Sequence, residues 1–452
     1  MPPPSQHDGT VSLRPAASFL GSPTIMPPLL RLPPEIFGYI TRDLELHDLR
    51  RFRLACRDVN RAVMPTFSRK GFNRVCVMLH QRSLEILVAI SRHPDFGPAV
   101  KTLAITLEHW PRHPHIKEAS KVVRHQQAYS VILEDQELLA ESGLGTAYLA
   151  QAMAALPSLK TVSIGGWGRP VGIDAATRQM GVYPVGSWSE RANTKLMMHA
   201  VRSIVLVLFA SRSTSVDELL FHDCDMHPEM LAFPPAAQRH MQASPLSSSL
   251  SYLLLEIESA ERERETMSNL PDFVALFSGL QRLTLKFPGS ERESNGFSEF
   301  ARTVRVQGLR FLQIQDVNCT EGDLLELMRR HKGSLEEARF LAVEIAAECG
   351  NWKQLLTAVR DEALVRVLGI DSCRDGDHDE HIGFRQSCGT GIEYLEDVII
   401  GEGGGESWTR AIDGIRSLSE ERAERRARAR GLRRSGPVLR PRRAWETPER
   451  YL

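Results

Sequence analysis

Two short phrases decide the fold of this chain: GLQRLTLKF at residues 279–287 and GLRFLQIQD at residues 308–316. The first phrase sets an apolar frame with Leu280, Leu283 and Leu285, and the second repeats it 29 positions later with Leu309, Leu312 and Ile314. Side chains two positions apart lie on the same face of a β-strand. Each phrase therefore predicts a strand with one buried face, and the recurrence predicts a repeated structural unit.

The same frame continues along the chain in both directions. It returns after 26 more residues at Leu335, Ala338 and Phe340, and after a further 30 at Val365, Leu368 and Ile370. From residue 156 onward, LPSLKTVSI, VDELLFHDC and LSYLLLEIE are looser copies. A period of 26 to 30 residues is typical of leucine-rich repeats with one strand and one helix each. We therefore predict an α/β fold in which residues 71–400 form an irregular leucine-rich-repeat-like solenoid of strands and helices.

The segments between the phrases predict the rest of each unit. EGDLLELMRRHKG and NWKQLLTAVRDEA carry apolar residues at helical spacing. The repeats are degenerate, because Ala338 is small and the asparagine that commonly closes the strand turn is present only as Asn318. Residues 165–195 are rich in Gly and polar residues, and residues 228–250 in Pro, Ser and Gln. These two stretches predict loop-like insertions in the array.

Both ends of the chain have a composition that predicts disorder. Residues 1–28 are rich in Pro and Ser and lack periodic apolar residues. Residues 401–452 begin with the linker GEGGGES and continue into a tail that holds ten arginines and two glutamates between Glu421 and Arg443. A charge run of this kind is a solvated tail, a nuclear import signal or, as the weakest alternative, a phosphate-binding segment.

Residues 29–63, LLRLPPEIFGYITRDLELHDLRRFRLACRDVNRAV, predict a tight set of short helices. Pro33 and Pro34 suit the first turn of a helix, where the missing N–H costs nothing. Ile36, Ile40 and Leu44 follow at a spacing of four and form an apolar stripe. A domain of about forty residues makes a poor core by itself. Either these helices cap the body that follows, or a partner protein completes their apolar surface.

This segment resembles the F-box family. The run Leu32-Pro33-Pro34-Glu35-Ile36, followed by Ile40, Leu44, Asp48-Leu49 and the run from Phe52 to Arg57, is similar in order and spacing to the F-box pattern, over about 40 residues. Glu45 and Phe52 depart from it, since the family often has a small capping residue and a leucine there. The stretch SLEILVAISRHPDFGPAVKTLAI, residues 83–105, also resembles fungal F-box proteins of the leucine-rich type.

The resemblance implies a domain order and a function. Residues 29–70 would be the F-box, which docks on the Skp adaptor of a Skp–cullin–F-box ubiquitin ligase, and the repeat body would hold a protein substrate. The chain would then be a non-catalytic subunit that needs no cofactor. The adaptor-binding surface would consist of Leu32, Pro33, Ile36, Ile40, Leu44, Leu49, Phe52 and Leu54. Two alternatives stay open: an F-box scaffold outside the ligase, and a leucine-rich-repeat receptor capped by its N-terminal helices.

The strand frame also predicts which residues meet the substrate. Residues between the buried positions point to the opposite face of the sheet. We expect this face to be polar and to bind the substrate through Arg282, Lys286, Gln313, Gln315 and Arg339, with Thr284 and Glu337 beside them.

Composition excludes several other classes of protein. Lys and Arg total 56, as do Asp and Glu, so net charge indicates no particular partner and nucleic acid is not favoured. The seven cysteines form no C-x-x-C pair, which favours a reducing compartment, cytoplasm or nucleus. We expect no membrane span, since the most apolar run, from Ile204 to Ala210, is far shorter than the roughly 20 residues needed.

Three candidate motifs for metals and phosphate do not meet their requirements. His222, Cys224 and His227 lack a fourth ligand nearby in sequence. Asp375, Asp377 and Asp379 lack the glycine and glutamate that complete a calcium loop. Gly401 to Gly405 lack the lysine of a phosphate-binding loop. We therefore predict no metal site and no enzymatic activity.

Overall fold

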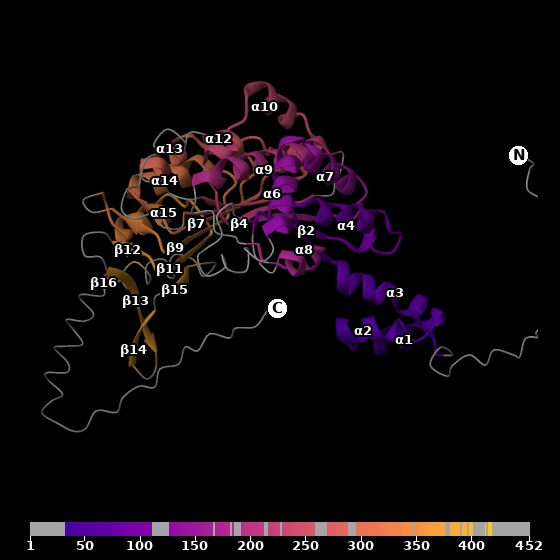
Figure 1. Ribbon diagram of the computed structural model, residues 1–452. Coiled ribbons are helices and arrows are strands. Elements are labelled where there is room, and N and C mark those ends of the chain that lie inside the picture. Colours follow the sequence, from indigo (N-terminus) through magenta and orange to yellow (C-terminus); the bar gives the residue numbers. More distant parts are fainter. Residues whose placement is uncertain are drawn as a thin grey trace, which may run out of the picture. The chain divides into compact units, whose positions relative to one another are not determined.

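Ten strands form one open sheet, in which each strand from β1 to β11 lies parallel to its neighbours and the last, β15, is antiparallel to β11 (Figure 1). Parallel neighbours need a crossover connection, which confirms the predicted α/β fold class and its solenoid-like arrangement. The strands, in sheet order, are β1 Arg74–Met78, β2 Thr102–Thr106, β3 Thr161–Gly165, β4 Glu218–Met226, β5 Tyr252–Ile257, β6 Arg282–Lys286, β7 Phe311–Gln315, β9 Glu337–Leu341, β11 Val367–Asp371 and β15 Asp397–Ile400.

The computed structural model describes residues 32–110, 126–165, 168–180, 183–184, 191–211, 216–226, 228–257, 269–287, 295–346, 349–375, 380–388, 391–395, 397–400, 412 and 415–417. The chain divides into two compact units, Met1–Gly71 and Phe72–Leu452. The smaller unit contains α1 Pro34–Asp43, α2 Leu46–Phe52 and most of α3 Arg57–Phe72. The arm at residues 1–28 and nearly all of the arginine-dense tail lie outside the described residues.

The register of the sheet confirms the predicted repeat frame. Leu283 pairs with Leu312, Leu312 with Ala338, and Ala338 with Leu368. All four side chains are at most 1% exposed. Leu285, Ile314, Phe340 and Ile370 form the next buried row in the same way. The degenerate Ala338 therefore keeps its place in the frame.

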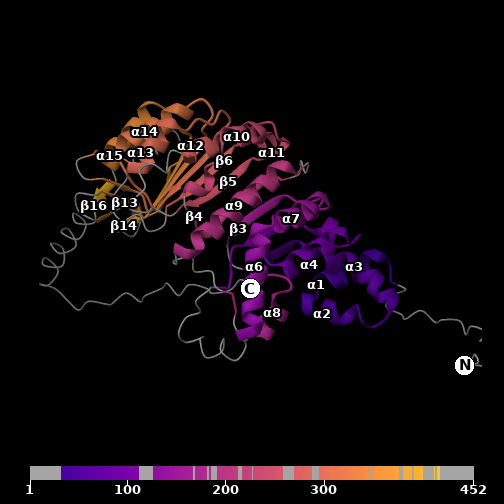
Figure 2. The same ribbon diagram turned by 45° about the horizontal axis from the view of Figure 1, so that its top comes forward.

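Helices lie along the buried face of the sheet, and the two layers share one continuous apolar core (Figures 1 and 2). The helices predicted at EGDLLELMRRHKG and NWKQLLTAVRDEA are α14 and α15. The helices whose side chains join this core include α4 Gln81–Arg92, α6 Gln126–Glu141, α7 Leu144–Ala154, α9 Arg191–Ala210, α12 Asn269–Val274, α13 Asn295–Thr303, α14 Glu321–His331 and α15 Trp352–Asp361.

A repeated corner follows the last three parallel strands. Asp316, Ala342 and Ser372, each one residue past its strand, have φ values of 55°, 49° and 53°. The chain then enters a second, smaller sheet through β8 Asn318–Cys319, β10 Glu344–Ile345 and β12 Arg374–Asp375, which pair in parallel. Left-handed backbone disfavours residues with a side chain, so the frame of apolar residues alone does not predict this corner.

Antiparallel strands end the array, after the last predicted repeat frame at Val365, Leu368 and Ile370. β13 Glu380–Cys388 pairs with β12, with β14 Gly391–Leu395 and with β16 Ile415–Ser417. The last of these strands lies inside residues 401–452, where the sequence predicts disorder.

The interpretation of residues 165–195 and 228–250 as loop-like insertions is wrong for much of their length. They contain α8 Ile173–Met180, the start of α9, the 3-10 helix η3 Pro228–Leu231, α10 Pro235–Gln242 and α11 Pro245–Ser249. Pro235 and Pro245 stand at the first positions of their helices, where proline is favoured. The hydroxyl oxygen of Ser244 accepts the Leu246 N–H and caps α11. The Pro and Ser that indicate loops are here helix-start signals.

The segment before α8 runs along the free edge of β1. The Val171 N–H donates a hydrogen bond of 2.9 Å to the Cys76 carbonyl. Beyond it, Ile173 of α8 joins a second buried cluster with Met78 of β1, Trp110 and residues of α6. Residues 171–176 therefore cover both the edge of β1 and part of the sheet's outward face, which leaves the later strands as the open part of that face.

Gly279 and Gly308 occupy equivalent positions before β6 and β7, yet their surroundings differ. A Cβ on Gly279 would lie 2.1 Å from the Ser248 carbonyl oxygen, whereas the nearest atom at Gly308, the Leu280 carbonyl oxygen, is 3.5 Å away. Backbone cannot yield as a flexible side chain does. We expect Gly279→Ala to lower the free energy of unfolding by about 2–3 kcal/mol and Gly308→Ala by less than about 1 kcal/mol. Urea unfolding followed by circular dichroism measures both; equal losses would contradict the close approach.

His331 of α14 makes the stability of the body depend on pH. Its Nδ1 lies 2.8 Å from the Leu327 carbonyl oxygen and its Nε2 accepts the Val306 N–H at 3.1 Å, so the buried ring is neutral. Burial lowers the pKa of His331 below its ordinary value of 6.5, and the nearby Arg330 lowers it further. Burial also lowers the pKa of His80.

Proton binding to the unfolded state decides the direction of this pH dependence. Above pH 6.5 neither the folded nor the unfolded state binds a proton at His331; as the pH falls through 6.5, only the unfolded state takes one up. The free energy of unfolding should therefore fall with decreasing pH, by up to about 1.4 kcal/mol per pH unit from this group. Urea unfolding between about pH 5 and pH 7 should show a smaller slope for His331→Gln than for wild type. The exposed His240→Gln is the control, and equal slopes for all three would refute this role of His331.

Candidate interaction surfaces

The helical unit has a very small interior. Among its described residues, the buried apolar side chains are Phe37, Leu49, Val59, Val63 and Phe67. The stacked rings of Phe37 and Phe52, with centroids 6.1 Å apart, join α1 to α2. The Thr41 hydroxyl donates to the Phe37 carbonyl and lies 3.3 Å from the Thr66 hydroxyl, which joins α1 to α3.

Prolines stand at two notable places in these helices. Pro65 lies inside α3 and does not end it, since the helix continues to Phe72. Val63 and Phe67 are buried on either side of Pro65, so tertiary packing holds the helix where proline removes a hydrogen bond. Pro34 is the first residue of α1, in the first turn as the sequence predicts, whereas Pro33 is the N-cap residue just before the helix.

Large apolar side chains are exposed at high density on this unit. Half of the ten most exposed large apolar residues in the described chain belong to it: Leu32, Ile36, Tyr39, Ile40 and Leu54. Their exposed fractions are 36%, 46%, 65%, 40% and 79% in that order. Ile36 and Ile40 are four residues apart on α1 and so lie on one face of the helix. We call these five residues the apolar patch.

The residues predicted to bind an adaptor divide between the apolar patch and the interior. Pro33 is exposed beside the patch, Leu44 and Phe52 are half-buried, and Leu49 is fully buried. Leu49 therefore contributes to packing and offers no accessible surface. Tyr39 is absent from the sequence prediction, although its position three residues after Ile36 places it on a neighbouring part of α1.

The residues predicted to bind a substrate lie on the open face of the sheet. Arg282 and Arg339 are exposed, and Lys286, Gln313 and Gln315 are partly exposed. Among the residues predicted there, Thr284 is the buried exception at 5% exposed, and the Tyr252 hydroxyl lies 3.4 Å from its own. The larger neighbours on β5 and β6 therefore cover it.

Aromatic and cationic side chains alternate across this face, from β5 to β9. The Arg282 guanidinium lies 4.4 Å from the ring centroid of Tyr252 and 5.8 Å from that of Phe311. The Arg339 guanidinium lies on the other side of Phe311, 5.5 Å from the same ring centroid. We call Tyr252, Arg282, Phe311 and Arg339 the cation–aromatic row. The sequence predicted the two arginines but not the two rings. Tyr252 and Phe311 occupy the positions that pair with Arg282 on the neighbouring strands.

Ion pairs flank the row. The Lys286 ammonium lies 3.0 Å from a carboxylate oxygen of Glu256, and the Arg339 guanidinium lies 2.6 Å from one of Glu337. In the described part of the chain, Arg282 has no carboxylate within ion-pair distance. Of the residues that the structure describes, the two rings are therefore what its charge contacts, and N–H groups at its edges remain able to donate.

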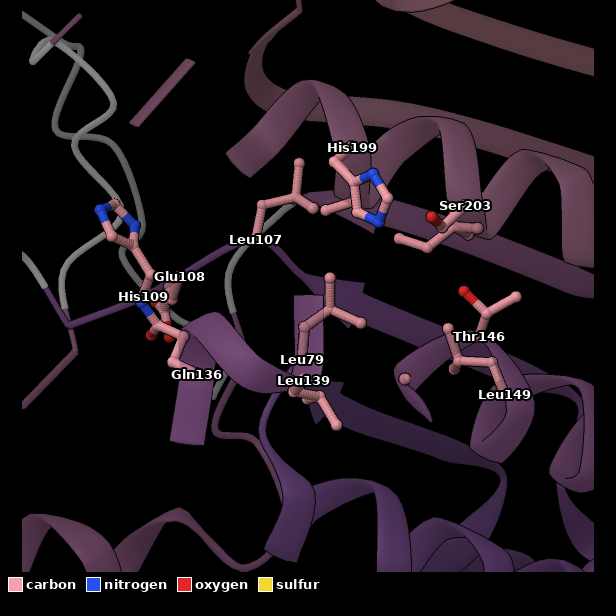
Figure 3. A pocket seen from close by; sticks show the side chains of 13 residues that line it. Leu79, Leu107, Glu108, His109, Gln136, Leu139, Thr146, Leu149, His199 and Ser203 are labelled. Carbon is pink, nitrogen blue, oxygen red and sulfur yellow. The ribbon is translucent and has the colours of Figure 1, made fainter. Parts of the chain in front are cut away.

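A cavity of about 50 Å³ lies between α6, α7 and α9 (Figure 3). His199 and Ser203 of α9 and Thr146 of α7 contribute polar atoms to a mostly apolar lining, and burial raises the pKa of the nearby Glu108. Ligand pockets usually measure about 300–1,000 Å³. This cavity has room for water and none for an organic substrate of ordinary size.

The sequence motifs with metal-ligand residues gain no support as sites. The His222 Nε2 lies 2.7 Å from the Ser163 hydroxyl, while the side chains of Cys224 and His227 are outside the described residues, as are those of Asp375, Asp377 and Asp379. Within the ranges that the structure describes, no three His, Cys, Asp or Glu side chains come together as metal ligands would. Over the same ranges, no helix combines the length and apolar character of a membrane span.

Comparisons with known proteins leave the chain without an assigned family. No family model matches it, and a search of curated proteins finds no match. Among solved structures, the chain is similar to one described as the crystal structure of the Rad7 and Elc1 complex in yeast, with 10% identity over 73% of this chain and 84% of that chain. The TM-score of 0.23 is too low for this likeness to carry any argument. Functional inference therefore rests on the residues and their geometry.

Proposed function

We propose that this chain is a protein-binding adaptor of a Skp–cullin–F-box ubiquitin ligase. In this proposal the helical unit binds a Skp-type adaptor, which connects to a cullin, and the open face of the sheet holds a protein substrate. The observation that carries the proposal is the apolar patch on a unit whose described interior holds five apolar side chains. The F-box-like order of its residues supplies the class of partner.

The physical argument concerns the cost of exposed apolar surface. Burial of apolar area in a partner contributes about 25 cal/mol per Å². Leu54, at 79% exposed, and Tyr39, at 65%, contribute little to the fold of the unit. Their burial under an adaptor would give both proteins a stabilising contact that this small unit cannot make by itself.

The repeat body would act by proximity. A substrate held on the sheet stays near a ubiquitin-charged enzyme recruited by the complex, so transfer of ubiquitin to its lysines becomes effectively intramolecular. The chemistry belongs to the recruited enzyme, and this chain supplies no catalytic group. The proposal places the chain in the cytoplasm or nucleus, where such ligases work.

Reconstitution with purified components tests the proposal. The full chain is mixed with a Skp-type adaptor, with and without a cullin, and the complexes are separated by size-exclusion chromatography. We expect a stable complex with the adaptor and a larger one when the cullin is added. An adaptor complex that excludes the cullin would assign the chain to a scaffold outside the ligase. Absence of both complexes would leave the helical unit as a cap and reject the proposal.

A further inference from the structure

We infer that the cation–aromatic row binds an acidic segment of the partner protein, with one Asp or Glu carboxylate seated on Arg282. The inference deepens the proposed function, because it names the chemistry of the segment that the receptor face would hold.

Two aromatic rings restrict the Arg282 side chain before any ligand binds. Its guanidinium carbon lies 4.4 Å from the ring centroid of Tyr252 and 5.8 Å from that of Phe311, so an aromatic ring lies on either side of it. A guanidinium over an aromatic face can still donate from its N–H groups, and two of them match the two oxygens of a carboxylate. Because the ring contacts already restrict the side chain, an incoming anion has less of it to order.

Arg282 differs from the other cations of the face. Lys286 lies against Glu256, and Arg339 lies against Glu337. Among the described residues of strands β5, β6, β7 and β9, the outward charged groups are therefore three cations and two carboxylates, which leaves one positive charge on these strands. That excess is located at Arg282. A single negative charge on the partner would balance it.

Carboxylates of the chain itself border this face and limit the charge that a bound anion can carry. Glu218 of β4 and Asp371 of β11 bound the face on either side, and both already accept hydrogen bonds from within the chain. With Glu256 and Glu337 they make a setting in which a phosphate dianion or a nucleic acid backbone meets several like charges. A carboxylate with one charge fits this pattern better than either.

The cation–aromatic row is accessible and long enough for a short peptide. Arg282 and Arg339 are exposed, and Tyr252, Phe311 and Gln313 are partly exposed. At Gly369 of β11, an added Cβ would lie 3.1 Å from the Arg339 side chain, so the lack of a side chain there lets Arg339 lie flat across the sheet. Strands about 4.8 Å apart then give a shallow row about 14 Å long from β5 to β9, enough for a short extended peptide.

A peptide selection on the full chain tests the inference. A phage library of random dodecapeptides is panned on immobilised wild-type protein, and selected sequences are made as synthetic peptides. We expect an Asp or Glu at one shared position, whose change to Asn or Gln weakens binding about tenfold or more. Arg282→Gln should cause a similar loss, and Arg282→Lys a smaller one, because lysine cannot bind bidentately. The matched control is Arg366→Gln, an exposed arginine just before β11, which should change binding less than about twofold.

Three results would overturn the inference: selection of no peptide, equal binding by wild type and Arg282→Gln, or tighter binding when phosphoserine replaces the acidic residue. The last would assign the face to phosphopeptides. Adaptor capture is measured on the same proteins. Arg282→Gln should bind the adaptor as well as wild type does. If wild type binds the selected peptides but does not bind the adaptor, the proposed function is refuted and this inference stands.

Discussion

Combining Pro33→Ala with Ile36→Asp is expected to lower the affinity of the chain for a Skp-type adaptor by at least about a hundredfold. Ile36 is 46% exposed and Pro33 is exposed beside it, so neither residue is needed to fill the interior of the helical unit. A carboxylate at position 36 would be desolvated in an apolar contact without a partner, which costs several kcal/mol. Isothermal titration calorimetry with purified adaptor measures the loss.

A matched control separates the patch from the general effect of a new charge. Leu138 of α6 is 63% exposed and lies in the larger unit, so Leu138→Asp introduces the same charge at an apolar site that is more accessible than Ile36. We expect its affinity for the adaptor to equal that of wild type, and circular dichroism to show both variants folded. Equal affinity for the double variant and wild type would contradict the role of the apolar patch.

Trp352→Ala should cause the largest loss of stability in the repeat body, about 3–5 kcal/mol of unfolding free energy. The indole is fully buried at the start of α15 and packs against Phe340 of β9, with ring centroids 5.7 Å apart. Its Nε1–H donates a 3.0 Å hydrogen bond to the Arg374 carbonyl in β12. One side chain therefore joins the helix layer to both sheets.

The conservative variant divides these contributions. Trp352→Phe keeps most of the ring packing and removes the hydrogen bond to Arg374, so we expect a loss of about 1–3 kcal/mol. Urea unfolding followed by circular dichroism at 222 nm is suitable, since the indole itself is changed. If Trp352→Ala were no less stable than Trp352→Phe, packing between α15 and β9 would not be what holds the last repeats together.

The sequence predicted the sheet of the body well because its signal is simple. Each strand has one buried face, and its apolar residues repeat every 26 to 30 residues, which specifies both the strands and their register. Even the small Ala338 therefore pairs with Leu312 and Leu368. The corner at Asp316, Ala342 and Ser372 escaped prediction, since these residues share no composition and their positive φ depends on what surrounds them.

The interaction surfaces were predicted less completely, for a similar reason. Exposure depends on neighbours that are distant in sequence: Thr284 is covered by Tyr252 from the strand before, and Leu49 is enclosed by the other helices of its unit. The cation–aromatic row needs the register of four strands before Phe311 can be placed between Arg282 and Arg339. Periodicity gives the face on which a residue lies, and only packing gives its accessibility.

The contact of Val171 with β1 bears on how copies of this chain behave toward one another. An edge strand with unpaired N–H and C=O groups is a template on which a strand of a second molecule can add, and such addition leads to aggregates. At β1 the Cys76 carbonyl is already taken by the chain's own Val171 N–H, and α8 packs immediately beyond it. Residues 171–176 thus protect against intermolecular strand pairing at β1, the first strand of the sheet among the described residues.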